Sequence, residues 1–316
     1  MPLATHGRYA YSPITERPAW EWPNGARLAA YVAVNVEAFP FAEGLGIPLV
    51  NPLPEPDVVN FGWRDWGNRV GVWYLLDALA EHAIPATALM NTAIIDLCPQ
   101  IPAALLARGD EIVGHGRTNA ERQSDMDEAQ ERAMINECRD RLARLTGAAP
   151  RGWMGPWVSE THRTPDLLAG AGFDYVMDWP HDDQPTLLST SAARDLVAVP
   201  YARPLNDLPA LHGAKWTPAE WADATIDGLE EMLRLSARHP LVFNLSLHPF
   251  LVAWPPRLRH LRRILARLAQ AAAAGEVWLC TAGAIATHAR PILDAQVLNA
   301  QVLGPQALEP HGNTAR

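Results

Sequence analysis

The sequence has few cysteines, almost no lysine and no long hydrophobic run. Its three cysteines, Cys98, Cys138 and Cys280, include no Cys-x-x-Cys spacing, which argues against a disulfide framework and against a zinc ribbon. No apolar stretch approaches the roughly 20 residues that a membrane-spanning helix needs. The first residues also lack the apolar segment of a secretory signal. These absences predict a cytoplasmic protein with reduced thiols.

Positive charge is also scarce. The chain has 26 basic and 35 acidic residues, which gives a formal net charge of -9. Nucleic-acid-binding domains usually carry an excess of basic residues on one face, and anionic membranes attract the same kind of surface. The charge balance therefore argues against nucleic acid and membrane partners, and we expect a small-molecule substrate.

Hydrophobic and aromatic residues are plentiful. Hydrophobic residues make up 48% of the 316 residues, which is ample material for a core. The twelve tryptophans occur in clusters such as Trp20 with Trp22, and Trp63 with Trp66. Such clusters indicate either core packing, the walls of a cleft, or subunit contacts. Because a monomer rarely exposes so much aromatic surface, we expect a homo-oligomer, either a dimer or a tetramer.

Strand-like and helix-like patterns alternate along the chain, which is typical of βα units and a parallel sheet. Strands are expected at 27–37, 86–91, 111–114, 151–154, 175–178, 197–200, 241–247 and 277–280, and helices at 67–83, 93–108, 127–146, 164–171, 217–238 and 257–274. We therefore predict an α/β protein with one distorted (β/α)7-type barrel at 27–290. An irregular arm (1–26) precedes the barrel, a long loop (39–62) covers one end of the sheet, and a loosely ordered tail (291–316) follows.

Polar side chains follow several of the predicted strands. In parallel α/β barrels the active site lies at the carboxyl ends of the strands. The side chains at these ends therefore form the candidate site. They are Asn35, Glu37, His115, Asn119, Arg151, Asp178, Trp179 and His248.

Five segments in this order resemble the motifs of the polysaccharide deacetylase (NodB-homology) superfamily. The resemblance is closer to its intracellular branch of allantoinase-like and cyclic-imide-hydrolase-like proteins, and it covers roughly residues 25–290. It implies the barrel fold and hydrolysis of a carbon–nitrogen bond. The matching segments are 35–38, 115–119, 151–157, 178–184 and 245–248.

The resemblance also bears on metal binding. In the family, an aspartate and two histidines hold a divalent metal, and this sequence has Ala38, His115 and Asn119 at those places. Alanine has no donor atom and an amide is a poor zinc ligand. The resemblance therefore implies a degenerate metal site, and no cofactor is favoured. A rebuilt zinc site of Glu37, His115 and Asp183 is the alternative.

The resemblance implies roles for five residues. Glu37 occupies the position of the catalytic base, and burial is expected to raise its pKa. His248 occupies the position of the general acid that protonates the leaving nitrogen. His115, released from metal binding, would orient water or polarise a carbonyl group. Arg151 and Asp178 would form a pair that orients the base and the acid, or a purely structural salt bridge.

Amide and indole side chains near these residues are candidates for substrate contact. An amide presents both a donor and an acceptor, which matches the C=O and N–H edge of an imide or ureide ring. An indole offers a flat apolar wall for such a ring. The candidates for substrate binding are Asn35, Asn119, Gln123, Trp157, Trp179 and Asp183.

Together these observations predict a hydrolase that opens a small cyclic imide or ureide. Two alternatives remain open. One is a metal-dependent carbohydrate N-deacetylase. The other is a binding protein that keeps the barrel but has lost catalysis, because function follows from the site and not from the fold.

Overall fold

A single curled sheet organises the protein. The computed structural model describes residues 5–42 and 46–303, in which nine strands form one sheet in the order β6-β7-β5-β4-β3-β2-β1-β8, with β9 also pairing with β1. Neighbouring strands are parallel except for β6 and β7, which are antiparallel. The strands are β1 (Leu28–Val36), β2 (Ala86–Met90), β3 (Glu111–Gly114), β4 (Gly152–Trp153), β5 (Tyr175–Val176), β6 (Thr186–Leu188), β7 (Leu196–Ala198), β8 (Leu241–Leu247) and β9 (Val277–Leu279).

Strand β1 is the centre of the sheet, and all nine of its residues are buried. It pairs with β2, β8 and β9. The backbone N–H of Val242, in β8, donates to the carbonyl oxygen of Asp183, just before β6, at 2.9 Å. This bond links the two ends of the strand order, so the sheet curls into an incomplete barrel. The predicted α/β barrel class is confirmed.

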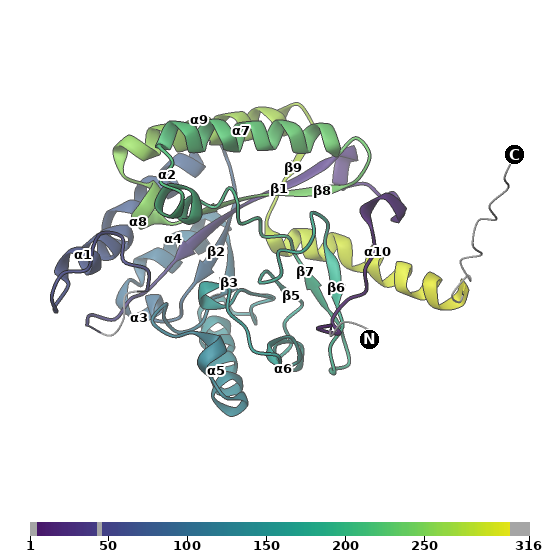
Figure 1. Ribbon diagram of the computed structural model, residues 1–316, viewed down its shortest axis with the longest axis horizontal. Coiled ribbons are helices and arrows are strands. Elements are labelled where there is room, and N and C mark those ends of the chain that lie inside the picture. The colour runs from purple at the N-terminus through teal and green to yellow at the C-terminus, as the bar shows by residue number, and fades with distance from the viewer. Residues whose placement is uncertain (1–4, 43–45, 304–316) are drawn as a thin grey trace, which may run out of the picture.

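Helices cover the outer face of this sheet (Figure 1). In β1, Val32, Val34 and Val36 pack against the helices, whereas Tyr31 and Ala33 pack inside the barrel. This alternation follows from the two-residue period of a strand. The helices are α1 (Val58–Trp66), α2 (Val72–Ala80), α3 (Ile94–Leu97), α4 (Gln100–Arg108), α5 (Glu128–Thr146), α6 (Thr164–Gly170), α7 (Pro218–Leu235), α8 (Pro249–Val252), α9 (Pro255–Ala273) and α10 (Ala282–Leu303).

The N-terminal arm packs on the body of its own chain. Arg8 forms an ion pair with Asp166 at 2.8 Å, and Arg17 forms one with Asp182 at 2.5 Å. Trp22 is only 1% exposed and packs with the residues inside the barrel. Tryptophan clusters suggest core packing, a cleft wall or a subunit contact, and Trp22 belongs to the core.

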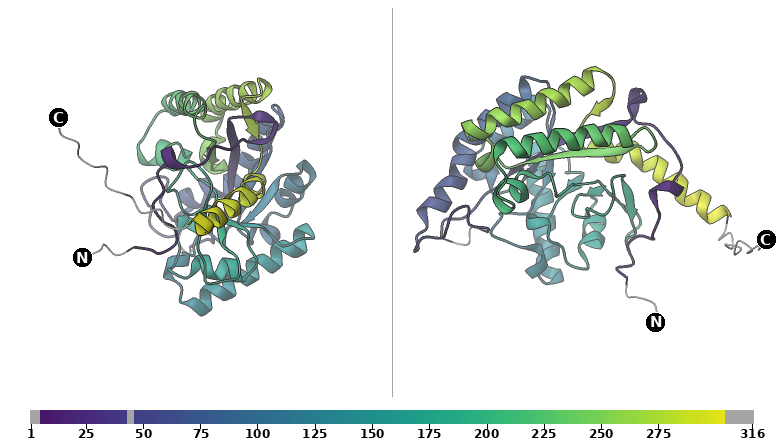
Figure 2. Two further views of the ribbon diagram at one scale, coloured as in Figure 1. Left: turned by 90° about the vertical axis from the view of Figure 1, so that its right-hand side faces the viewer. Right: turned by 45° about the horizontal axis from the view of Figure 1, so that its top comes forward.

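Helix α10 closes the end of the barrel where the strands begin. The backbone N–H of Ala282 donates to Thr87 in β2, and that of Gly283 donates to Glu111 at the start of β3. Figure 2 shows α10 lying across this end. The prediction of an irregular tail from residue 291 was wrong, because α10 continues through Pro291 to Leu303. Residues 304–316 lie outside the described residues.

The predicted loop at 39–62 contains a helix that the sequence analysis missed. Asp57 caps α1 by accepting a hydrogen bond from the backbone N–H of Asn60. A π-helical turn, Gly67–Gly71, then joins α1 to α2. Gly62, in the middle of α1, disfavours a helix and obscures its pattern.

No helix in the described part of the chain has the length and hydropathy that crossing a bilayer requires.

The close approach of the π-helical turn to α8 gives a test of the packing behind the site. A methyl group added at Gly67 would lie 2.6 Å from Cβ of Phe250 and 2.8 Å from its backbone nitrogen. We expect Gly67→Ala to lower the free energy of unfolding by about 1–3 kcal/mol, the usual cost of overpacking. Gly62→Ala has no atom within 4 Å of the added methyl group and should raise it by about 0.5–1 kcal/mol. Urea denaturation measures both, and equal stabilities would contradict this packing.

Candidate active site

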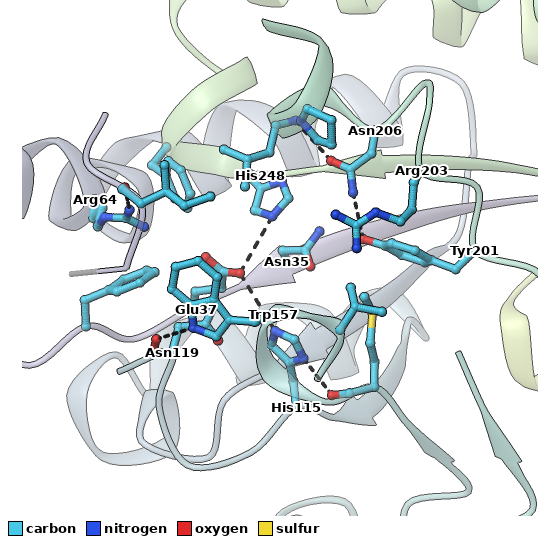
Figure 3. A pocket seen from close by; sticks show the side chains of 17 residues that line it. Asn35, Glu37, Arg64, His115, Asn119, Trp157, Tyr201, Arg203, Asn206 and His248 are labelled. Carbon is cyan, nitrogen blue, oxygen red and sulfur yellow. Dashed lines mark hydrogen bonds and ion pairs between the residues drawn. The ribbon is translucent and has the colours of Figure 1, made fainter. Parts of the chain in front are cut away.

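Three side chains from different strand ends converge at the end of the barrel opposite α10. Glu37 follows β1, His115 follows β3 and His248 follows β8. Oε1 of Glu37 lies 3.8 Å from Nε2 of His115 and 3.7 Å from Nε2 of His248. All three are buried. Figure 3 shows the carboxylate between the two imidazole rings, so the central group of the site is a carboxylate flanked by two histidines.

These side chains line a cavity of about 110 Å³. Phe39, Met154 and Phe250 contribute apolar walls. A space of this size suits a small molecule whose orientation a few polar groups determine. The further polar lining consists of Asn35, Arg64, Asn119, Tyr201, Arg203 and Asn206.

His248 is held by a buried carboxylate. Its Nδ1–H donates to Oδ1 of Asp207 at 2.6 Å, and its backbone N–H donates to Oδ2 at 2.7 Å. Burial alone would lower the pKa of His248, but the charge and hydrogen bond of Asp207, together with the charge of Glu37, outweigh it and raise that pKa. Nε2 of His248 therefore faces the cavity as a proton donor.

His115 is held by a neutral group instead. Its Nδ1–H donates to the backbone carbonyl oxygen of Met154 at 2.7 Å, because a carbonyl can only accept. This leaves Nε2 facing Glu37. Among the described residues Nε2 has no hydrogen-bond partner. A buried polar atom without a partner is rare, so Nε2 is available to a water molecule or to the substrate.

The pKa of Glu37 differs from the expectation. Burial raises it, as predicted, but the approach of His115 and the positive charges of His248 and Arg64 outweigh burial and lower it below its usual value. The prediction of a raised pKa was wrong because burial was considered without the neighbouring cations. Glu37 is therefore ionised at neutral pH.

Three of the predicted substrate contacts line the cavity. Asn35 donates to the carbonyl oxygen of Leu247, and Trp157 donates to that of Asn119. Asn119 and Trp157 thus form one wall, and Asn35, in β1 two residues before Glu37, bonds the end of β8. Their place in the lining fits the role that the sequence suggests for them.

The predicted pair of Arg151 and Asp178 does not form. Arg151 lies at the start of β4, and its guanidinium binds Asp174 at 2.6 Å. The start of a strand is the wrong end for the site. Asp178 instead accepts from the backbone N–H of Gly155. Burial, followed by the nearby charge of Glu160, raises the pKa of Asp178 well above its usual value. Asp178 therefore supports the loop that carries Trp157 and does not line the cavity.

Three further predicted residues also lie outside the cavity lining. The amide of Gln123 donates to Glu131 at 2.6 Å in a buried network. The indole of Trp179 donates to Glu160. Asp183 is next to the start of β8, whereas His248 follows the end of that strand. Gln123, Trp179 and Asp183 were assigned to the site from proximity along the chain, which the fold does not preserve.

Several residues of the site were not predicted from the sequence. Tyr201 directly follows the strand predicted at 197–200, so the strand-end rule would have found it, whereas Arg203, Asn206 and Asp207 lie further along the connecting segment. Arg64 lies in α1, between the loop predicted at 39–62 and the helix predicted at 67–83, and no sequence signal marked it.

The residues at the family's metal positions do not fit a metal. Ala38 offers no side-chain donor, and Oδ1 of Asn119 already accepts from the amide of Asn91 at 3.2 Å. The alternative set with Asp183 fails because Asp183 is not at this end of the barrel. Within residues 5–42 and 46–303, no group of three or more His, Cys, Asp or Glu side chains is arranged to hold a metal ion.

Two kinds of comparison relate the chain to known proteins. Residues 62–176 match the family model for polysaccharide deacetylase. A peptidoglycan deacetylase of Helicobacter pylori is 24% identical over 231 residues, which is 63% of this chain and 77% of that protein.

Solved structures resemble the whole barrel. A probable polysaccharide deacetylase from Pseudomonas aeruginosa PAO1 superposes with a TM-score of 0.77 at 26% identity, covering 87% of this chain and 95% of that chain. The structure of PuuE allantoinase gives a TM-score of 0.76 at 25% identity, covering 90% and 98%. The chain is therefore similar to polysaccharide deacetylases in residues 62–176 and to a probable polysaccharide deacetylase and an allantoinase in the fold of its barrel.

Proposed function

We propose that this protein opens the ring of a small cyclic imide or ureide by hydrolysis, with Glu37 as general base and His248 as general acid. The observation that carries the proposal is the ionised carboxylate of Glu37 between two imidazoles, one backed by a carboxylate and one by a carbonyl group. Similarity to polysaccharide deacetylases and to PuuE allantoinase supports a hydrolase of carbon–nitrogen bonds other than peptide bonds.

The gaps of 3.7 and 3.8 Å around Glu37 are too long for direct hydrogen bonds and leave room for a bridging atom. A water molecule there donates a hydrogen bond to Glu37 and lies beside Nε2 of His115, which orients it. Glu37 takes the proton of that hydrogen bond as the water oxygen attacks the ring carbonyl carbon. The carbon–nitrogen bond then breaks, and Nε2–H of His248 donates its proton to the departing nitrogen.

A cyclic imide or ureide suits this site better than an N-acetyl sugar. The nitrogen of an imide is a better leaving group than that of an ordinary amide, so its cleavage depends less on a Lewis acid. Two of the three metal positions here, Ala38 and Asn119, lack a suitable donor. The cavity of about 110 Å³ also favours a small ring over a polymer. Similarity to PuuE allantoinase supports the ureide class.

Removing the base tests the proposal. We expect Glu37→Gln to lower kcat for ring opening by roughly two to four orders of magnitude, the range of general-base catalysis, because an amide does not accept a proton from water. Succinimide, hydantoin, dihydrouracil and allantoin are the substrates, and ring opening is followed chromatographically.

The matched control is Glu231→Gln. It removes an exposed carboxylate of α7 that pairs with Arg234 on the same helix, and the rate should not change. Full activity of Glu37→Gln would exclude the proposed base. Activity of the wild type on an N-acetyl sugar alone would exclude the proposed substrate class.

The pKa shifts predict a bell-shaped dependence of kcat/KM on pH. The active form has Glu37 ionised and His248 protonated. The pKa of Glu37 lies below 4.5 and that of His248 above 6.5. We therefore expect kcat/KM to fall as pH drops through the pKa of Glu37 and as pH rises through the pKa of His248. Asp207→Asn removes the charge that raises the pKa of His248, so the alkaline midpoint should move to lower pH. An unmoved midpoint would show that His248 is not the acid.

A further inference from the structure

Arg64 is a buried cation that the proposed chemistry does not use. It comes from α1, lines the cavity and is 6% exposed. Figure 3 shows it beside Glu37 and His248. Within the described residues, no carboxylate oxygen lies within 4.0 Å, the limit for an ion pair, of a guanidinium nitrogen of Arg64. No side chain in residues 5–42 and 46–303 therefore neutralises the positive charge of Arg64 by direct contact.

Two aromatic rings hold the guanidinium of Arg64 in one orientation. Its Cζ lies 4.0 Å from the ring centroid of Phe39 and 5.1 Å from that of Phe250. One terminal N–H donates to the backbone carbonyl oxygen of Ile47. Its Nε has no partner in the described part of the chain. Stacking on aromatic faces leaves the N–H groups free at the edge of the plane, which is the geometry for binding a planar anion.

Keeping this cation buried is costly. Burial lowers the pKa of Arg64 to about 10, even though the charge of Glu37 acts in the opposite direction. Arg64 is therefore still charged at neutral pH, and a buried charge without a partner destabilises the folded protein. A ligand that supplies the missing negative charge removes this energetic cost and therefore binds more tightly.

The charges around the cavity favour an anion. Arg203, which is exposed, lines the same cavity and has no ion pair in the described residues. Among the lining residues Glu37 is the one acidic side chain, and Asp207, behind the lining, is already paired with His248. The lining thus has two guanidinium groups and one ionised carboxylate, so its net charge is positive. A positive cavity attracts anionic ligands.

We propose that Arg64 binds a carboxylate carried by the substrate, so that the natural substrate is a cyclic imide or ureide with an acidic substituent on a ring carbon. This rests on the proposed function for the ring-opening step. The guanidinium anchors the carboxylate, and the anchor places the ring carbonyl group beside Glu37. An arginine can bind a carboxylate through two parallel hydrogen bonds, which fixes orientation as well as affinity.

A matched pair of ligands tests the inference. Hydantoin-5-acetate and 5-methylhydantoin share the ring and differ in the carboxylate. We expect the wild type to prefer the first by roughly 10- to 100-fold in Kd and in kcat/KM, the scale of a hydrogen bond to a charged group. Arg64→Met should abolish this preference. Arg64→Lys should retain part of it, because lysine keeps the charge but lacks the planar fork.

Arg69→Met is the control, because Arg69 is an exposed cation that already pairs with Asp65, and the preference should persist in that variant. Calorimetry measures Kd whether or not the rings are opened. If Arg64→Met does not fold, the preference of the wild type must still decrease with added salt and must be smaller in Arg64→Lys.

The outcomes separate the two proposals. Ring opening with no preference for the carboxylate, or equal losses for both ligands in Arg64→Met, overturns the role of Arg64 and leaves the proposed function standing. Arg64-dependent binding of hydantoin-5-acetate without opening of either ring supports the anion site and overturns the proposed function. Equal binding of both ligands by the wild type also overturns the inference.

Discussion

The site depends on how one carboxylate is surrounded. Glu37 is buried at the end of the central strand, where burial alone would favour its neutral form. Two histidines and the buried Arg64 reverse that preference and keep it charged. Because His248 is backed by Asp207 and His115 by the carbonyl group of Met154, two chemically equal imidazoles acquire different roles. When two groups of the same kind have different environments, a protein can give them different roles at one pH.

The fold provides this arrangement through the order of its strands. Strands β3, β2, β1 and β8 are consecutive neighbours in the sheet, so residues more than 200 positions apart in the sequence meet at one end. Asn91, after β2, binds the backbone N–H of Ala38 and the side chain of Asn119, which ties the loops after β1 and β3 together. Packing of the arm and α10 at the opposite end leaves the carboxyl ends of the strands to form the cavity.

Part of this could be predicted from the sequence. Buried strands have a plain apolar pattern, and a polar residue at the end of one is easy to see, so Glu37, His115 and His248 were found. Arg151 shows the limit of the rule, because the start and end of a two-residue strand cannot be told apart by pattern. Asp178 does follow the end of its strand, but its carboxylate binds the backbone of Gly155 and does not line the cavity. Asp207 and Arg64 lie on connecting segments whose positions depend on tertiary packing. The pKa of Glu37 was predicted in the wrong direction for the same reason, since the cations that lower it come from distant segments.

The unequal backing of the two imidazoles can be measured directly. A titration of the histidine side chains by ¹⁵N NMR, with His248 assigned from the loss of its signals in His248→Gln, reports where its ring loses a proton. The account predicts that His248 titrates above its ordinary value of 6.5 and at lower pH once Asp207 is replaced by asparagine. A His248 that titrates below that value in the intact protein would contradict the assignment of the acid and, with it, the account of the site.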